Sequence, residues 1–269
     1  MAEVWVSGRL VSADQAVVPY DDHGTTVGDG VFETLKIVDG SPFHLDRHLD
    51  RLRRSADAMS IPCPDPAALH VAIDAVLGTH GDEPAFLRIT LTAGRGPLGT
   101  PRGALSPNLI VAIRPGNVRL DPTDVVVVPW TRNEHGALAG VKSTSYGENV
   151  VALVAASRTG ADEALFANTA GNLCEGTGSN VFVGLDGALL TPPLSSGCLA
   201  GVTRALLVEA GIGIEADIPM SRLDDIEEMF LVSTGREVQP VRRIDGRELP
   251  SCPGPLTAHA RDLWVRQIG

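Results

Sequence analysis

The sequence predicts an α/β or α+β protein made of two subdomains. Strand-like and helix-like segments alternate from one end of the chain to the other, and a turn-rich segment at residues 114–122 separates two such runs. Of the 269 residues, 43% are hydrophobic and 20% are charged, which is typical of a globular protein with a large core. We place the boundary after residue 118, which gives subdomains 1–118 and 119–269, the second of which contains Lys142.

The first subdomain is predicted to contain four strands and two helices. Alternating apolar and polar side chains predict the first strand, Glu3–Leu10, and the other predicted strands are Val31–Val38, Ala85–Thr92 and Asn108–Ile113. The first helix, His44–Met59, has leucines at helical spacing and ends before Pro62, and the second helix is Pro66–Leu77. The Gly- and Pro-rich segment Ala93–Pro107 is long enough to form a functional lid.

The second subdomain is predicted to contain three helices, which are Glu148–Arg158, Thr203–Ala210 and a terminal helix from Leu256. The first of these carries Val150, Leu153 and Val154 on one face. The predicted strands are Val125–Pro129, Glu163–Ala167, Val181–Gly184, Ala188–Leu190 and a hairpin-like pair, Glu228–Ser233 and Val238–Ile244. No G-x-G-x-x-G motif lies between a strand and a helix, which argues against a dinucleotide-binding domain.

Composition excludes several classes of partner. A formal charge of −11 argues against nucleic acid and anionic membranes, because both require a basic surface. The four cysteines have no spacing for zinc or a redox dithiol, and His44 and His48 lack the glutamate of a zinc protease motif, so no metal site is expected. No apolar stretch approaches ~20 residues and the start does not resemble a signal peptide, so we expect a soluble, cytoplasmic protein.

The chain has only two lysines, Lys36 and Lys142, and therefore only two side-chain amines that could attack a carbonyl carbon. Arginine cannot take this role, because its guanidinium stays protonated. Lys142 follows the loop Arg132–Gly136 in a stretch of apolar, small and glycine residues, which suits a buried amine. An ordinary surface lysine is the alternative.

Two loops of the second subdomain could bind an anion. The segment Ser195–Arg204 runs into a helix, where backbone N–H groups and the Thr203 hydroxyl could bind a phosphate, although ordinary capping would use the same residues. The strand end Val232–Arg236 presents the hydroxyls of Ser233 and Thr234 beside a cation. Without a Walker lysine, the pair of loops suits a phosphate monoester.

Further charged residues have two interpretations each. Arg47, Arg51 and Arg54 share one helix face, which could be solvated or could supply a phosphate ligand. Glu175 lies between apolar residues and a run of small residues, where it could be functional or an exposed glutamate at a strand edge. The glycines of Gly24–Gly30 could form a nucleotide loop or a tight structural turn.

Short motifs that span nearly the whole chain occur in a specific order, and each of them is common by itself. They are Asp22-His23-Gly24, Gly28-Asp29-Gly30-Val31-Phe32-Glu33-Thr34, His48-Leu49-Asp50-Arg51-Leu52, Lys142-Ser143, Cys174-Glu175-Gly176, Ser179-Asn180-Val181-Phe182, Leu199–Arg204 and Glu237–Val241. In this order they resemble the fold-type IV pyridoxal-phosphate (PLP) enzymes. This family contains D-amino acid and branched-chain aminotransferases, (R)-amine transaminases and aminodeoxychorismate lyases.

The resemblance implies a role for each matching residue. Lys142 would hold PLP as a Schiff base and then move a proton, and Glu175 would keep the pyridine nitrogen protonated. Arg51 would bind the phosphate together with groups from two loops, namely Val202, Thr203, Ser233 and Thr234. The resemblance further implies a two-subdomain fold with the cofactor between the subdomains, and a homodimer whose partner chain contributes to the active site.

The sequence departs from the family where the substrate would bind. D-Amino acid aminotransferases have a tyrosine where this chain has Phe32, and an Arg-x-His carboxylate trap in the loop that matches Ala93–Pro107, which here lacks it. The candidate cations for a substrate carboxylate are Arg88, Arg95 and Arg236, and the sequence does not choose among them.

The expected reaction is amino-group transfer between a D-amino acid or primary amine and a 2-oxo acid. The first alternative is 4-amino-4-deoxychorismate lyase, which eliminates pyruvate on the way to 4-aminobenzoate. A non-catalytic sugar- or phosphate-binding protein on the same scaffold is the second alternative.

Overall fold

The computed structural model describes residues 3–268. The chain forms two compact units, of which the first comprises Met1–Asn117 and Val141–Tyr146 and the second Val118–Gly140 and Gly147–Gly269. The sequence predicts a boundary after residue 118, with Lys142 in the C-terminal part. In the structure, the short segment with Lys142 packs with the first unit.

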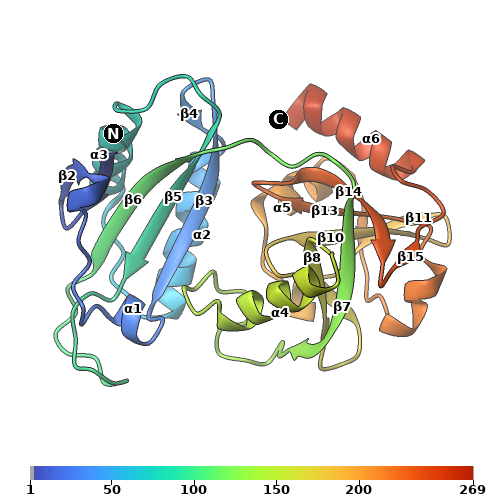
Figure 1. Cartoon of the computed structure of the whole chain (residues 1–269), viewed down its shortest axis with the longest axis horizontal. Coiled ribbons are helices and arrows are strands. Elements are labelled where there is room, and N and C mark those ends of the chain that lie inside the picture. Colours follow the sequence, from blue (N-terminus) through green and yellow to red (C-terminus); the bar gives the residue numbers. More distant parts are fainter. Residues whose placement is uncertain (1–2, 269) are drawn as a thin grey trace. The chain divides into compact units, whose positions relative to one another are not determined.

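A six-stranded sheet forms the centre of the first unit, with the strand order β2-β1-β6-β5-β3-β4 (Figure 1). All its neighbouring strands are antiparallel. The strands are β1 (Glu3–Val6), β2 (Arg9–Ser12), β3 (Gly30–Val38), β4 (Ser41–Pro42), β5 (Ala85–Thr92) and β6 (Asn108–Pro115). A 3-10 turn (Ala13–Gln15) and a one-turn helix, α1 (His23–Thr26), precede β3.

The predicted single strand Glu3–Leu10 was wrong, because the chain reverses within it. Ser7 and Gly8 adopt positive φ angles of 52° and 78°, and the strands on either side pair as a two-residue hairpin. A turn with two consecutive left-handed residues matches the right-handed twist of the two strands. Glycine is favoured in such a turn because it adopts a positive φ angle easily. The other predicted strands of this half lie at β3, β5 and β6.

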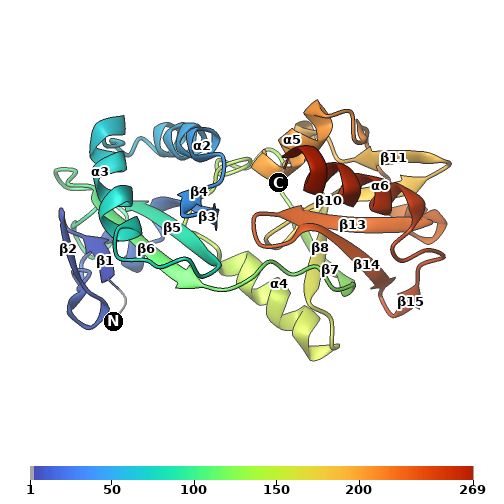
Figure 2. The same ribbon diagram turned by 90° about the horizontal axis from the view of Figure 1, so that it is seen from above.

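Two helices, α2 (Leu45–Ala58) and α3 (Pro66–Leu77), cover one face of this sheet, as Figure 2 shows. Both helices were predicted. Alternate residues of β3 point towards them, and Val31, Leu35 and Ile37 pack in one core with leucines of α2. Glu33 occupies the same face of β3 but is a carboxylate in this apolar layer.

The second unit contains a nine-stranded mixed sheet with the order β12-β11-β10-β13-β14-β7-β8-β9, and β15 pairs with β14. Three pairs are parallel: β14 with β7, β7 with β8, and β11 with β12. The strands are β7 (Thr123–Arg132), β8 (Glu163–Asn168), β9 (Leu173–Gly176), β10 (Asn180–Leu185), β11 (Ala188–Thr191), β12 (Ile214–Glu215), β13 (Glu228–Ser233), β14 (Glu237–Ile244) and β15 (Arg247–Glu248). The predicted α/β class is confirmed.

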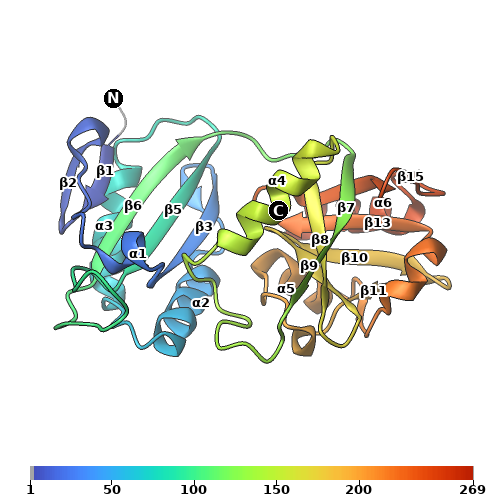
Figure 3. The same ribbon diagram turned by 60° about the horizontal axis from the view of Figure 1, so that its bottom comes forward.

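Three α-helices belong to this unit: α4 (Gly147–Arg158), α5 (Val202–Glu209) and α6 (Pro255–Leu263), with 3-10 turns at Leu194–Ser196 and Met220–Asp225 and a final turn at Trp264–Ile268. Helix α4 crosses β7 and β8 (Figure 3). It packs there through Ala152 and Ala156. The predicted apolar face of this helix points instead to solvent. Among the described residues, no helix is long and apolar enough to span a bilayer.

Candidate active site

The backbone of Lys142 is fixed on both sides. Its carbonyl oxygen accepts a hydrogen bond from the N–H of Phe32 in β3 at 3.0 Å. Its own N–H donates to the hydroxyl oxygen of Ser55 in α2 at 3.3 Å. The next residue, Ser143, forms a β-bridge with Val31. A strand and a helix of the first unit therefore hold the lysine's main chain in place.

The amine of Lys142 lies among aromatic rings. Its Nζ atom is 4.4 Å from the centroid of the Phe32 ring and 5.8 Å from that of Tyr146. The Tyr146 hydroxyl is 3.4 Å from the same nitrogen, and the two rings meet edge to face with centroids 5.0 Å apart. Lys142 is half-buried, so the geometry favours the buried amine over the surface lysine.

A buried charge cluster lies between β3 and α2. Glu33 is 0% exposed, and its carboxylate accepts hydrogen bonds from Nε and Nη2 of Arg51, both at 2.7 Å. The Nδ1 atom of His48 lies 2.7 Å from the same carboxylate. Burial alone would raise the pKa of Glu33, but the charge and hydrogen bonds of Arg51 outweigh it and lower that pKa to about 2. Arg51 is thus a buried residue and does not belong to a solvated face.

Arg88 lies on the opposite face of the sheet, next to Lys142. Its guanidinium carbon is 3.5 Å from the centroid of the Phe32 ring, and its Nε donates to the hydroxyl of Thr90 at 3.2 Å. Phe32 therefore contacts two cations, the guanidinium of Arg88 and the amine of Lys142. Two adjacent cations suit a substrate that carries a carboxylate.

The other two candidate arginines are bound to carboxylates elsewhere. Arg95 is exposed and forms a bidentate pair with Asp21 at 2.9 Å. Arg236 is 8% exposed, hydrogen-bonds Gln239 and lies 3.3 Å from the carboxylate of Glu163. Of the three candidates, Arg88 is the one that shares an aromatic ring with Lys142.

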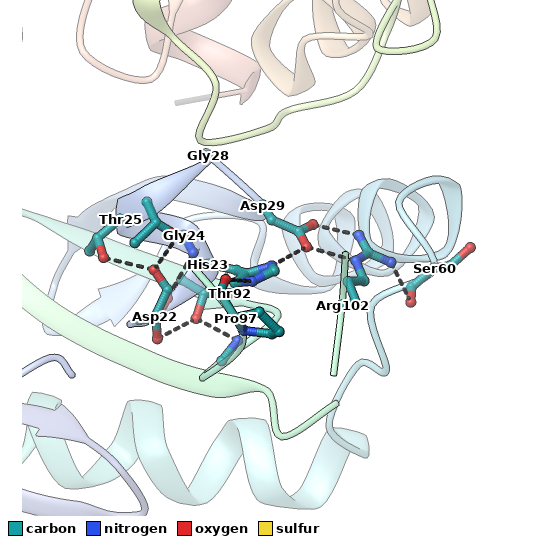
Figure 4. Close-up of polar contacts among 12 residues, drawn as sticks. Asp22, His23, Gly24, Thr25, Gly28, Asp29, Ser60, Thr92, Pro97 and Arg102 are labelled. Atoms are coloured by element: carbon teal, nitrogen blue, oxygen red, sulfur yellow. Dashed lines mark hydrogen bonds and ion pairs between the residues drawn. The ribbon is translucent and has the colours of Figure 1, made fainter. Parts of the chain in front are cut away.

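Figure 4 shows a polar cluster that attaches the Ala93–Pro107 loop to the turn before β3. The buried His23 has its Nε2 atom 2.9 Å from the carbonyl oxygen of Pro97. Arg102 donates to both oxygens of Asp29, from Nε at 2.7 Å. Asp22 caps α1 through the N–H of Gly24 at 2.8 Å. The contacts favour a structural turn over a nucleotide loop.

In the second unit, Glu175 lies on β9, a strand that the sequence pattern does not predict. The backbone N–H of Leu199 donates to its Oε2 at 2.9 Å, and Nε of Arg132 lies 3.4 Å from its Oε1. The Glu175 side chain is only 12% exposed. This environment differs from the exposed strand edge that was the alternative. Arg132 was not predicted as a site residue, because it lies forty-three positions from Glu175 and no local pattern joins them.

The predicted anion loops of this unit lie at the start of α5 and the end of β13. Val202 and Thr203 begin α5 and are buried, and its N-cap is Gly201, which supplies no capping side chain. A Cβ on Gly201 would lie 2.0 Å from the Oδ1 atom of Asn180, so any larger residue would displace the Asn180 side chain. Ser233 and Thr234 are half-buried where β13 ends. Backbone N–H groups at such a helix start suit a phosphate.

The thiols take no part in these arrangements. All four cysteines are free, and burial raises the pKa of Cys198 to about 11 and that of Cys174 still further above its usual range. Raised values keep both groups protonated and unreactive at neutral pH. Within residues 3–268, no group of three or more His, Cys, Asp or Glu side chains could hold a metal ion.

Comparison with known proteins identifies the family. Residues 30–244 match the amino-transferase class IV model. The chain belongs to this family. It is 33% identical to the bifunctional aminodeoxychorismate lyase / D-amino acid transaminase of Mycobacterium tuberculosis, over 93% of both chains. The family depends on PLP, so the chain is a PLP-dependent class IV enzyme and the predicted resemblance is confirmed.

Solved structures of the family have the same fold. The branched-chain amino acid aminotransferase of Escherichia coli superposes with a TM-score of 0.91 at 27% identity, covering 99% of this chain and 94% of the other. A hypothetical aminotransferase from Mycobacterium tuberculosis in a PLP-bound form gives 0.87 at 28% identity, covering 99% of each. The relatives of this class IV aminotransferase thus include proteins that are named as branched-chain aminotransferases, as D-amino acid transaminases and as aminodeoxychorismate lyases.

Proposed function

We propose that this class IV enzyme transfers an amino group between a D-amino acid or a primary amine and a 2-oxo acid. One observation carries the proposal: the amine of Lys142 and the guanidinium of Arg88 contact the same ring, Phe32, on one face of a sheet. An amine nucleophile beside a carboxylate-binding cation is the arrangement that amino acid chemistry needs. The preference for D-amino acids rests on the similarity to a relative that is named a D-amino acid transaminase.

The donor groups present suit PLP. Lys142 supplies an amine for the aldehyde, Arg51 and the α5 N-terminus supply N–H donors for the phosphate, and Ser233 and Thr234 add hydroxyls. Bound PLP supplies an electron sink for the substrate's Cα. We therefore propose PLP as the cofactor of this chain.

We assign proton transfer at the substrate Cα to Lys142. Its main chain is fixed by Phe32 and Ser55, so only the side chain has to move between positions. The Tyr146 hydroxyl, 3.4 Å from Nζ, can accept a hydrogen bond from the amine and orient it.

We propose that Glu175 interacts with the ring nitrogen of the cofactor. A carboxylate that is mostly buried and held by the N–H of Leu199 keeps a fixed position. Its negative charge would favour the protonated form of a nearby ring nitrogen, and Nε of Arg132 lies 3.4 Å from its other oxygen, Oε1.

We also propose a cytoplasmic homodimer. Helix α4 exposes Val150, Val151, Leu153 and Val154, with exposed fractions of 58%, 53%, 40% and 47%. Neighbouring aliphatic side chains that remain in water on one helix mark an interaction surface. Free cysteines suit a reducing compartment. Sedimentation of the wild type and of Val151→Lys tests the dimer: the wild type should sediment as a dimer and the variant as a monomer.

The function is tested by adding single donors to the purified holoenzyme, in both enantiomers where they exist. A transaminase converts its bound cofactor from the aldehyde to the amine form with a donor alone, and the visible absorbance band then disappears. If no donor changes the band, amino-group transfer is refuted. Lys142→Ala should fold and lack both the band and the reaction.

The lyase remains the second candidate, because the relative with 33% identity is named for both activities. Incubation with 4-amino-4-deoxychorismate distinguishes the two. Release of pyruvate without any reaction of amino acid donors would establish the lyase, and release of pyruvate together with donor reactions would establish both activities. Purified protein that lacks the visible band and cannot be reconstituted with PLP would favour the non-catalytic binding protein.

A further inference from the structure

We propose that Glu33 is a positioning residue, which orients Arg51 towards the phosphate group of the cofactor. The inference rests on the proposed function, because it assumes that the phosphate binds to Arg51. It adds a residue that does not itself touch the cofactor. The supporting observations are the burial of Glu33, the geometry of its hydrogen bonds and the location of the pair beside Lys142.

The first observation is that Glu33 is fully buried in an otherwise apolar layer. Its neighbours on the same face of β3, Val31 and Leu35, are 0% exposed and belong to the hydrophobic core. Burying an ion pair gains little stability over apolar side chains of similar volume. A carboxylate at this position therefore calls for a reason other than packing.

The second observation is the orientation of Arg51. Two adjacent nitrogens of its guanidinium donate to the two oxygens of Glu33, both at 2.7 Å, which fixes the plane and the direction of the group. A guanidinium presents N–H donors along more than one edge, so one arginine can hold two anions at the same time. The same arginine can therefore bind a second anion in a direction that Glu33 sets, without the cost of ordering a flexible side chain on binding.

The third observation is the location of the pair. Ser55 lies one helical turn after Arg51 on α2, and its hydroxyl accepts a hydrogen bond from the N–H of Lys142. Phe32 immediately precedes Glu33 in β3, and its N–H donates to the carbonyl of Lys142. Glu33 and Arg51 thus lie on the same two elements that hold the lysine. The proposed phosphate ligand and the main chain of the proposed Schiff-base lysine are therefore held by one framework.

The test compares the affinities of wild type and Glu33→Gln for PLP and for pyridoxal, which lacks the phosphate. Equilibrium dialysis of the apoenzyme measures binding independently of turnover. Loss of charged hydrogen bonds that orient Arg51 should weaken PLP about 10- to 100-fold and leave pyridoxal nearly unchanged. Equal weakening of both ligands, or no change in either, would refute the positioning role.

Two controls separate orientation from damage to the fold. Asp29 has a matching environment in the same unit, with a bidentate arginine, Arg102, and a histidine 3.6 Å away, so Asp29→Asn should not change the ratio of the two affinities. In an Arg51→Gln background, the effect of Glu33→Gln on PLP should disappear. An effect that persists there would show that Glu33 acts without Arg51.

If Glu33→Gln does not fold, Glu33→Asp takes its place. Aspartate keeps the charge but withdraws the carboxylate by one methylene. The affinity for PLP should therefore fall by a smaller factor than in Glu33→Gln, and the affinity for pyridoxal should stay the same. A wild type that binds neither ligand would refute the proposed function and this inference together. A wild type that binds PLP, with variants that bind it equally well, would refute the positioning role alone.

Discussion

Replacing Glu33 by glutamine should make the fold less stable in a way that depends on pH. The pKa of Glu33 is lowered from 4.5 to about 2 by Arg51 and His48 against the effect of burial. At 1.36 kcal/mol per unit, this lowering contributes about 3 kcal/mol to the free energy of unfolding at pH 7. The same figure corresponds to a fall of roughly 6–12 °C in Tm for Glu33→Gln.

The direction of the pH effect follows from the lowered pKa. A carboxylate whose folded pKa is depressed stabilises the protein fully above its unfolded pKa, and this contribution disappears as the pH falls through the folded value. The stability difference between wild type and Glu33→Gln should therefore be constant above about pH 5 and shrink towards zero near pH 2. A protonated glutamic acid and a glutamine are nearly the same size, so the two proteins become equivalent there.

Urea unfolding followed by circular dichroism between pH 7 and the lowest pH at which both proteins fold measures this difference. The matched control is Asp50→Asn on α2, since Asp50 is exposed and, within the part of the chain that the structure describes, pairs with Arg53 at 3.5 Å. Such surface pairs contribute little, so its curve should follow the wild type. If the free energies of unfolding of Glu33→Gln and wild type differ by the same amount down to pH 3, the pKa of Glu33 is not lowered in the folded protein.

Three other substitutions test the site and its framework. Glu175→Gln should retain PLP but lower kcat about 10²- to 10⁴-fold in the proton-transfer steps, and an unchanged kcat would remove its assigned role. Arg88→Met should raise KM for amino acids at least about tenfold while KM for a primary amine without a carboxylate stays the same; a parallel change would point to general damage. Gly201→Ala should cost about 1–3 kcal/mol in urea unfolding, because its Cβ would lie 2.0 Å from Asn180, and full stability would contradict that close contact.

Sequence patterns predicted most elements of the first unit, since strands such as β3 and β5 have a long alternating pattern and α2 has a regular apolar face. The four-residue strand β9 was missed because Leu173–Gly176 is too short and too rich in small residues to show a period. The hairpin at Ser7-Gly8 was missed because the alternation continues through the turn. Only the paired strands reveal it.

The sequence motifs propose a set of site residues but not the contacts among them. The motifs predict roles for Lys142, Glu175 and Arg51, whereas no local pattern joins Arg51 to Glu33, eighteen residues earlier, as an ion pair. The choice of a substrate-binding arginine likewise depends on tertiary contacts. Arg88 contacts the ring of Phe32, whereas Arg95 and Arg236 pair with carboxylates. Charged partners across different elements depend on tertiary packing, which sequence periodicity does not encode.

The first unit consists of two pieces of chain separated by more than twenty residues of the second unit. During synthesis, the strand Gly30–Val38 leaves the ribosome long before its bridging partner at Ser143 exists. A fragment that stops at Asn117 would lack that partner, so we expect it to be expressed poorly. Adding the peptide Val141–Tyr146 through a short linker should improve its yield, which gives a route to dissecting this enzyme into parts.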